Sequence, residues 1–361
     1  MSTLCTVLGH PERIRALSPA GWDLLLREAR SQQLCARLSH LLEQRGLLPE
    51  CPPQAATELC AQRFFAEHTQ ARVRLCLRKL RRALAPTETP VVLLKGAAYA
   101  ARGLAVARGR DFADLDILLP VDKLEAAETR LCASGWTARK TDPYDQRYYR
   151  RWMHELPPLV HTATGLELDV HHRLLPRTSR LKPPAAPLWR ESVPLALSPY
   201  RTLSPRHMVL HSMAQLFHDG EVAGGLDNLL DIHQLLTELG IEEGFWPGLL
   251  EAAEGLHLER PLYYGLEMSR SLLGTAVPSD TLAEARRFRP PALTGSLMCA
   301  LMRNALEPRY PRRRPAHVSA WLLYLRSHWL RMPPALLASH LTRKAVATLL
   351  APASVQDTRG P

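Results

Sequence analysis

The sequence lacks the patterns of a membrane-spanning or secreted protein. None of its 361 residues belongs to a run approaching the roughly 18 consecutive apolar residues that a bilayer-spanning helix needs. Residues 1–8 also lack the basic segment followed by an apolar segment that forms a secretory signal. We therefore expect a chain with no transmembrane segment and a cytoplasmic location.

The sequence also lacks a cysteine framework. Its seven cysteines include no Cys-x-x-Cys pair, and their number is odd. This usage argues against a set of structural disulfides and against a zinc knuckle. We expect ordinary buried thiols, because free cysteine is usually an interior residue.

Lysine is scarce, since it supplies only six of the 46 basic residues. A chain rich in arginine, alanine and proline can reflect the base composition of its gene, so the net charge of +11 does not by itself indicate a polyanionic partner. The charge is concentrated, because residues 286–344 contain twelve basic residues and one acid, Glu307. Nucleic acid or an anionic surface is therefore an open alternative as a partner of residues 286–344, beside the ordinary solvated surface.

The length and the apolar pattern predict a chain that folds into several structural units. A single core usually stops growing near 250 to 300 residues, so 361 residues exceed one unit. Apolar residues at helical spacing predict helices within 18–85, and Pro86 and Pro90 end them. The following short apolar runs predict an α+β fold with a small mixed sheet between about 90 and 175. Strands are expected at 91–94, 112–119, 136–140, 148–154 and 166–171, and helices at 97–107 and 121–134.

The second half of the chain is expected to be helical. A proline-rich stretch reads as a linker, and apolar periodicity then predicts helices at 207–217, 226–239, 246–253 and 260–273, with two more within 318–350. The expected parts are an N-terminal helical segment 1–88, a core 89–180, a linker 181–205, a helical domain 206–275 and a basic helical C-terminal region 276–361.

Two carboxylates inside an apolar run are the most informative feature. Asp114 and Asp116 are one residue apart in Phe-Ala-Asp-Leu-Asp-Ile-Leu-Leu, and a strand places such residues on the same face, roughly 6.6 to 7 Å apart. Two bare like charges at 4 Å repel by about 4 kcal/mol at an effective dielectric constant of 20. A divalent cation removes that cost, so the pair predicts a magnesium site.

A third acid follows on a later strand. Residues 166–171 alternate strictly, which puts Asp169 on one side with Glu167 and His171 and leaves the apolar residues on the other. If this strand pairs beside the first, Asp169 reaches the same ion. Three oxygen ligands with positions left for water suit Mg²⁺, with Mn²⁺ as a substitute. Such a site supports phosphoryl or nucleotidyl transfer, with Asp169 placed to act as the base.

These segments resemble a known family. Leu-Leu-Lys-Gly-Ala-Ala at 93–98, Arg-Asp-Phe-Ala-Asp-Leu-Asp-Ile-Leu-Leu at 110–119 and Leu-Asp-Val-His at 168–171 are similar to the uncharacterised nucleotidyltransferases within the DNA polymerase beta-like superfamily. The similarity continues through 207–211 and 230–232 and covers roughly residues 15–260. It implies a nucleotidyltransferase core at 89–180, an NTP as substrate and a hydroxyl-bearing acceptor.

The resemblance also implies roles for single residues. It implies that Asp114, Asp116 and Asp169 are the catalytic and metal-binding acids. It also implies that the turn at Gly96 and Ala97 binds the triphosphate. Ala97 replaces the serine of the wider superfamily, and Lys95 and Arg110 are expected to supply the missing phosphate contact. Other readings stay open, since Gly96 could be a simple turn glycine and Arg110 could pair with a neighbouring acid.

The histidines are open to two readings. His171 is either a partner that orients Asp169 or a satisfied histidine at a sheet edge, and His154 and His161 are weaker candidates. His207, His211 and His218 fall near one helical face, with Asp227 and Asp231 on the next helix, so a zinc site is conceivable. Helix-packing contacts are the favoured reading, because no zinc-binding motif accompanies them.

The sequence thus predicts a magnesium-dependent enzyme that transfers a nucleoside monophosphate from an NTP to a hydroxyl of a protein, a sugar or a small molecule. One alternative is a metal-dependent glycosyltransferase that uses the Asp-x-Asp pair, although only one expected strand precedes Asp114. Another alternative is a non-catalytic module that binds polyanions through residues 286–344.

Overall fold

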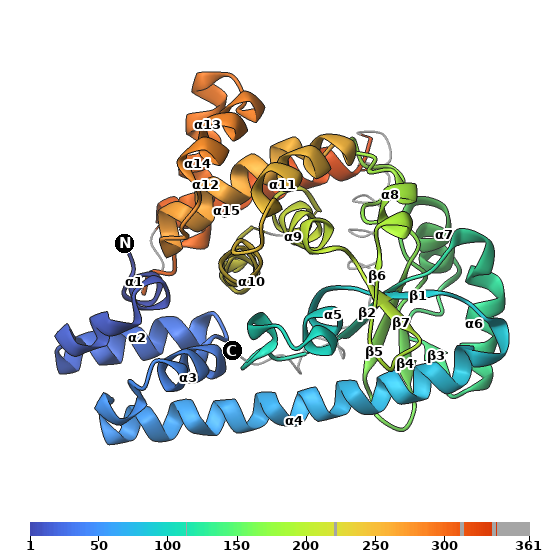
Figure 1. Ribbon diagram of the computed structural model, residues 1–361, viewed down its shortest axis with the longest axis horizontal. Helices are drawn as coiled ribbons and strands as arrows, with labels where there is room; N and C mark the ends of the chain where they lie inside the picture. The colour runs from blue at the N-terminus through green and yellow to red at the C-terminus, as the bar shows by residue number, and fades with distance from the viewer. Residues whose placement is uncertain (113, 220–221, 311–313, 334–336, 338–361) are drawn as a thin grey trace, which may run out of the picture.

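The computed structural model describes residues 1–112, 114–219, 222–310, 314–333 and 337. Helices enclose one mixed sheet on both sides, so the expected α+β class is confirmed (Figure 1). Within these residues, no helix combines the length and the apolar character that crossing a bilayer requires.

The N-terminal part is helical, as the periodicity predicts. Serine side chains begin two of its helices, since Ser2 and Ser18 each accept a hydrogen bond from a backbone N–H of the first turn. The helix α4 has 32 residues, about 48 Å, and it runs along the bottom of Figure 1 from α2 and α3 to the sheet. The helices are α1 (Thr3–Gly9), α2 (Pro19–Ser31), α3 (Cys35–Gln44) and α4 (Pro53–Leu84), with short turns η1 (Pro11–Ala16), η2 (Leu48–Glu50) and η3 (Ala85–Thr87).

The sheet has seven strands in the order β3-β4-β5-β2-β1-β7-β6. Its parallel pairs are β2 with β5 and β1 with β7, and the other neighbours are antiparallel. The strands are β1 (Val91–Leu93), β2 (Asp114–Leu118), β3 (Trp136–Ala138), β4 (Leu159–His161), β5 (Glu167–His171), β6 (Val193–Pro194) and β7 (Tyr200–Thr202).

The register of β2 and β5 follows from their apolar faces. Leu115 and Ile117 of β2 and Leu168 and Val170 of β5 are almost fully buried and share one face of the sheet. Because the side-chain period of a strand is two, this burial turns the alternate residues of both strands to the other face. The polar residues of two distant segments therefore share one surface.

Two expectations about the sheet were wrong. Residues 148–154 were expected to form a strand because of their aromatic content, but they lie largely in the helix α7 (Pro143–Trp152). Pro143 occupies the first turn of that helix, and the Asp142 side chain caps it by accepting from the N–H groups of Tyr144 and Asp145. The sheet also extends beyond residue 175, because β6 and β7 come from the proline-rich stretch, and β7 pairs with β1.

The remaining helices follow the expected order with changes at their ends. The helix expected at 97–107 begins at Lys95 and stops at Arg102, where Gly103 adopts a positive φ of 70°. Sequence reasoning missed α13 and α14, and most of the last expected helix within 318–350 lies outside the described residues. The helices are α5 (Lys95–Arg102), α6 (Leu124–Ala133), α8 (Ala185–Arg190), α9 (Pro205–Ala214), α10 (Leu226–Leu239), α11 (Phe245–Gly255), α12 (Glu259–Leu273), α13 (Ser279–Ala285), α14 (Ala292–Leu306) and α15 (Arg314–Arg331), with turns η4 (Ala105–Ala107), η5 (Val121–Lys123), η6 (Gln215–Asp219) and η7 (Arg286–Phe288). The five-part division of the chain stays a prediction.

A buried charge network joins the N-terminal helices to the helical half. Arg37 of α3 donates from Nη1 to Asp227 Oδ1 and Asp231 Oδ1 of α10, each at 2.6 Å, and its Nη2 donates to Gln234. Arg110, just before β2, donates to the other oxygens of the same two acids. Two arginines thus neutralise two acids at the meeting point of three segments.

Replacing Arg37 by glutamine should destabilise the fold strongly. The change leaves the buried Asp231 and the partly buried Asp227 with one arginine, and breaking a buried ion pair costs about 3 to 5 kcal/mol. Urea unfolding would measure the loss. The control is Arg27→Gln, which removes an exposed pair with Asp23 at 2.9 Å and should cost less than about 0.5 kcal/mol. Equal losses for the two variants would show that the network adds no stability.

Candidate active site

Three acids from two strands meet on the polar face of the sheet. Asp114 and Asp116 lie on β2, and Asp169 lies on β5 directly beside Asp116 in the parallel register. One carboxylate oxygen from each residue lies within 4.8 Å of one from each of the others. The structure therefore brings together the three acids that the sequence singled out, although 53 residues separate Asp116 from Asp169.

Two cationic or polar groups hold the central acid. Lys95 Nζ donates to Asp116 Oδ1 at 2.7 Å, and His171 Nε2 lies 2.9 Å from the same oxygen. All three side chains are largely buried. Of the two interpretations of His171, a partner that orients Asp169 or a satisfied histidine at a sheet edge, neither named Asp116, which is the acid that His171 contacts, two residues beyond Asp169 on β5.

The three acids differ in charge environment. Burial by itself raises the pKa of Asp116, but the Lys95 ammonium and the His171 imidazole hold that pKa well below its usual range. The charge of Asp116, together with burial, raises the pKa of Asp114. Burial, followed by the charges of Glu155 and Asp116, raises the pKa of Asp169 to about 8. The single ammonium group thus stabilises one acid and leaves the repulsion on the other two uncompensated.

The acid cluster fits a divalent metal ion. Asp169 Oδ1 is buried and has no hydrogen-bond partner among the described residues, and such an atom is costly unless something binds it. Carboxylate oxygens are the ligands that Mg²⁺ and Mn²⁺ prefer. Asp114, Asp116 and Asp169 are therefore the residues that would hold the ion.

The N-terminus of α5 opens beside the acids. Its first backbone N–H groups have no partner within the helix, and no side chain caps them. Lys95 has a φ of +44° at this corner, which is an unusual conformation for a residue with a side chain. Gly96 does not have a positive φ, but a Cβ there would lie 2.6 Å from the Phe112 ring. Glycine is thus required for space, not for the turn.

Arg110, a candidate phosphate ligand, already forms ion pairs with two acids. Its Nη1 donates to Asp227 Oδ2 at 3.1 Å and to Asp231, so it does not pair with Asp111 or Asp114 as one reading had it. Burial lowers its pKa, but the charges of Asp231 and Asp227 outweigh burial and raise the pKa above its usual value. Its phosphate contact stays a prediction, as do those of Lys95, Gly96 and Ala97.

A cavity of about 610 Å³ reaches the site from the side of the N-terminal helices. Asp114 and Arg110 line it, and the other residues come from the end of α2, the segment after it, α3, α4, the loop before β2 and the region of α10. Its size lies in the range of small-molecule sites. Its lining combines charged residues of both signs with neutral polar side chains, the latter being Gln32, Gln33, Gln62, Thr69 and Asn228.

Sequence reasoning missed Glu155 as part of the site. Its Oε2 lies 3.5 Å from His171 Nδ1, and Glu155 and His171 form an isolated antiparallel bridge at the end of β5. Together with His154, these residues form a second group whose ligand atoms lie within 4.8 Å of one another. No periodicity marks Glu155, because it lies between α7 and β4 in an irregular segment.

The histidines of the helical half make packing contacts. His218 Nε2 lies 2.6 Å from Ser179 Oγ, and His207 lies 3.4 Å from Glu191. Asp227 and Asp231 bind arginines, and within the described part of the chain these residues form no metal-binding group. Burial, with the charges of Lys95 and His171, lowers the pKa of His211 to about 3. The zinc reading is therefore not supported.

The basic region 286–344 is described only in part. Several of its arginines have partners within the fold. Arg287 lies 3.0 Å from Glu254, Arg309 lies 2.6 Å from Glu307, and Arg326 donates to the carbonyl of Phe217 at 2.8 Å. A polyanionic partner for this region stays a prediction.

A comparison with family models gives one match. The model described as uncharacterised nucleotidyltransferase matches residues 18–274. This span includes the helices α2 to α4, the whole sheet and the helices α9 to α12. No curated protein matches the chain.

A divalent ion should stabilise the protein through the acid cluster. A ligand at a hundredfold excess over its dissociation constant adds about 2.7 kcal/mol to the free energy of unfolding. The melting temperature should therefore be several degrees higher in excess Mn²⁺ than in EDTA. Asp169→Asn should abolish this gain. The matched control is Glu167→Gln on the same face of β5, because Glu167 pairs with Arg139 and lies outside the cluster. An unchanged gain in Asp169→Asn would exclude the ion from this cluster.

Proposed function

The chain belongs to the uncharacterised nucleotidyltransferase family, and from this premise we propose that it transfers a nucleoside monophosphate from an NTP to a hydroxyl group, using Mg²⁺. The observation that carries the proposal is the convergence of Asp114, Asp116 and Asp169 beside the uncapped N-terminus of α5. A family of transferases and a cluster of metal-binding type support the same reaction class.

In the proposed reaction each part of the site has one task. The acceptor oxygen forms a bond to the α-phosphorus, the bond to the leaving pyrophosphate breaks, and Asp169 takes the hydroxyl proton. A divalent ion held by the three acids would supply positive charge to the phosphate oxygens and lower the pKa of the hydroxyl. The first backbone N–H groups of α5, at Gly96 and Ala97, have no side-chain cap and would bind the triphosphate, because helix N-termini bind anions. Ala97 offers no hydroxyl, so the backbone carries this contact.

Lys95 and His171 act as positioning residues in this proposal. Both contact Asp116 Oδ1, so they hold the acid in a fixed orientation and keep it ionised. Lys95 is the first residue of α5, so its ammonium group would also contact a phosphate bound at the N-terminus of this helix. The cavity lined by Asp114 and Arg110 is the proposed entrance for a substrate.

The glycosyltransferase alternative has less support. A glycosyltransferase that binds a sugar nucleotide through Asp-x-Asp needs a larger nucleotide-binding unit before the acids, whereas β1 is the one described strand before β2. The family match also indicates transfer of a nucleotidyl group. The acceptor is a protein, a sugar or a small molecule.

Transfer should be visible with labelled nucleotides. The full-length protein, Mg²⁺ and cell extract are incubated with each NTP carrying the label on the α-phosphate or on the γ-phosphate. Label should move to an acceptor only from the α-position. Asp116→Ala should lower the transfer by more than the roughly 10- to 100-fold that loss of a metal ligand's outer partner costs.

The control for this assay is Asp122→Asn, which changes an exposed acid just after β2 and should leave transfer unchanged. Transfer of the γ-label would indicate a kinase-type reaction and contradict the proposal. Transfer that persists in Asp116→Ala would show that the acid cluster is not the active site.

A further inference from the structure

A second cavity lies on the opposite face of the sheet from the acids. It has a volume of about 500 Å³ and lies between α4, α5 and the hairpin of β6 and β7. Leu93 and Thr202 are partners in the β1 and β7 register, and both line the cavity. Because Leu93 pairs with Ile117, these residues share the apolar face of the sheet. The cavity is thus separate from the cavity at Asp114.

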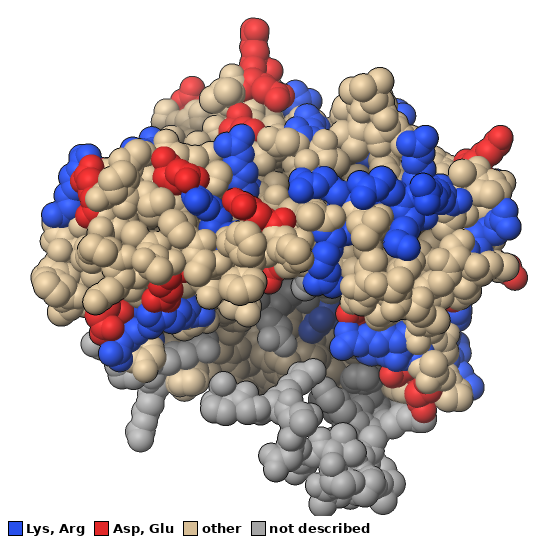
Figure 2. Space-filling view, turned by 90° about the horizontal axis from the view of Figure 1, so that it is seen from below, with Lys and Arg blue, Asp and Glu red and all other residues tan. Residues whose placement is uncertain are grey.

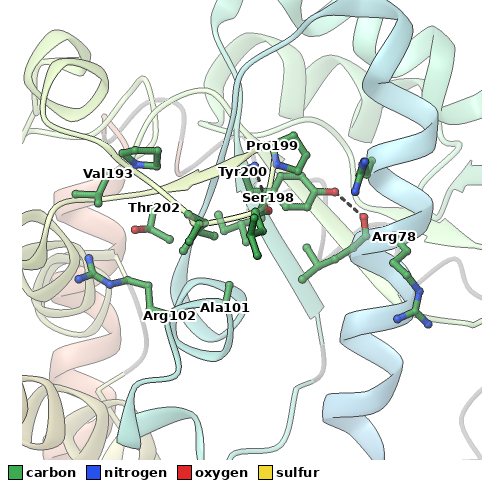
Figure 3. A pocket seen from close by; sticks show the side chains of 15 residues that line it. Arg78, Ala101, Arg102, Val193, Ser198, Pro199, Tyr200 and Thr202 are labelled. Atoms are coloured by element: carbon green, nitrogen blue, oxygen red, sulfur yellow. Dashed lines mark hydrogen bonds between the residues drawn. The ribbon is translucent and has the colours of Figure 1, made fainter.

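The cavity has an apolar body with rigid walls. Aliphatic residues of the hairpin, including Val193, Leu195 and Pro199, line it together with Leu77 of α4. Tyr200 fixes the hairpin to α4, because its hydroxyl donates to the carbonyl oxygen of Leu77 at 2.5 Å (Figure 3). The volume suits a small organic molecule.

Two buried polar atoms at one end have no partner. Thr202 is fully buried, and its Oγ1 has no hydrogen-bond partner among the described residues. Nη1 of Arg102, at the C-terminal end of α5, is likewise buried without a partner in the described part of the chain. Figure 3 shows the two side chains on the same side of the cavity. Native proteins rarely leave such atoms unsatisfied, so this end is built for a ligand with acceptor oxygens.

The charge around the cavity is positive. Arg78 and Arg81 of α4 line its other side, and none of the residues that line it is acidic. From residue 69 to residue 84, α4 carries six basic residues and no acid. Figure 2 views the molecule from the side of α4 and shows Lys and Arg side chains gathered over one half of that face. A field of this kind attracts anions and repels cations.

From these observations we infer that the cavity is a second binding site, which takes a small organic anion with an apolar body and a carboxylate or phosphate head. The head accepts hydrogen bonds from Arg102 and from the Thr202 hydroxyl, since guanidinium groups match both oxyanions. The apolar body lies against the hairpin and Leu77. Arg78 and Arg81 at the rim raise the local concentration of the anion. The inference does not depend on the proposed transfer reaction.

Binding of three probe molecules to the full-length protein tests the inference. Benzoate and phenyl phosphate carry the two possible heads, and benzyl alcohol is their neutral counterpart. Isothermal titration calorimetry should show saturable binding of at least one anion and much weaker binding of the alcohol. The tighter anion identifies the head group. An alcohol that binds as tightly as both anions, or the absence of binding by either anion, would overturn the inference.

Variants place the head group in the cavity. Arg102→Gln should weaken binding of the tighter anion on the order of tenfold or more, because a hydrogen bond to a charged group is lost. Thr202→Val should weaken it several-fold without lowering the melting temperature, since the hydroxyl has no protein partner to lose. The Thr202 variant keeps the test valid if Arg102→Gln does not fold.

Two arginines of α4 form a matched pair of controls. Arg78→Gln should weaken binding modestly, whereas Arg74→Gln, one turn away on the same helix and outside the cavity, should leave it unchanged. Equal affinity for the wild type, Arg102→Gln and Thr202→Val would show that the anion binds elsewhere and overturn the assignment.

Discussion

The parallel pairing of β2 and β5 brings three carboxylates close together. The repulsion between these carboxylates is the constraint on which the site depends. The apolar faces of these strands fix their register, and the register leaves Asp116 beside Asp169. Burial then strengthens every charge interaction at this surface. Two groups partly offset the repulsion, the Lys95 ammonium and the His171 imidazole, and both contact Asp116. The remaining negative charge is what a bound cation would neutralise.

The convergence of the three acids could be predicted from the sequence because its signal is local. In a strand with alternating polar and apolar residues, the alternation predicts which side chains share a face. When two such strands each carry acids on one face, few pairings of the strands are possible. The partners of the acids were harder to predict. Lys95 reaches Asp116 through an unusual backbone conformation, and the arginine network joins residues as far apart as Arg37 and Asp231. No spacing in the sequence marks either contact.

The errors in the fold have a common physical origin. The strands β4, β6 and β7 have only two or three residues, which is too short for alternation to be visible. Their place in the sheet depends on neighbours from distant segments, as β7 depends on β1. The helix α7 was mistaken for a strand because aromatic residues favour strands on average, while its cap at Asp142 and the proline that follows favour a helix start. Local capping outweighed average preference here.

The ion pairs of Arg37 have a consequence for attempts to divide the molecule. α3 supplies Arg37, α10 supplies Asp227 and Asp231, and the segment before β2 supplies Arg110. A shortened chain that begins at the sheet would keep all three acids of the cluster, yet it would leave the buried Asp231 and the partly buried Asp227 with half of their neutralising charge. In deletion mapping, such a shortened chain would lose activity because it misfolds, and the loss could be mistaken for removal of a functional residue. The smallest functional unit must therefore include sequence well before the first strand.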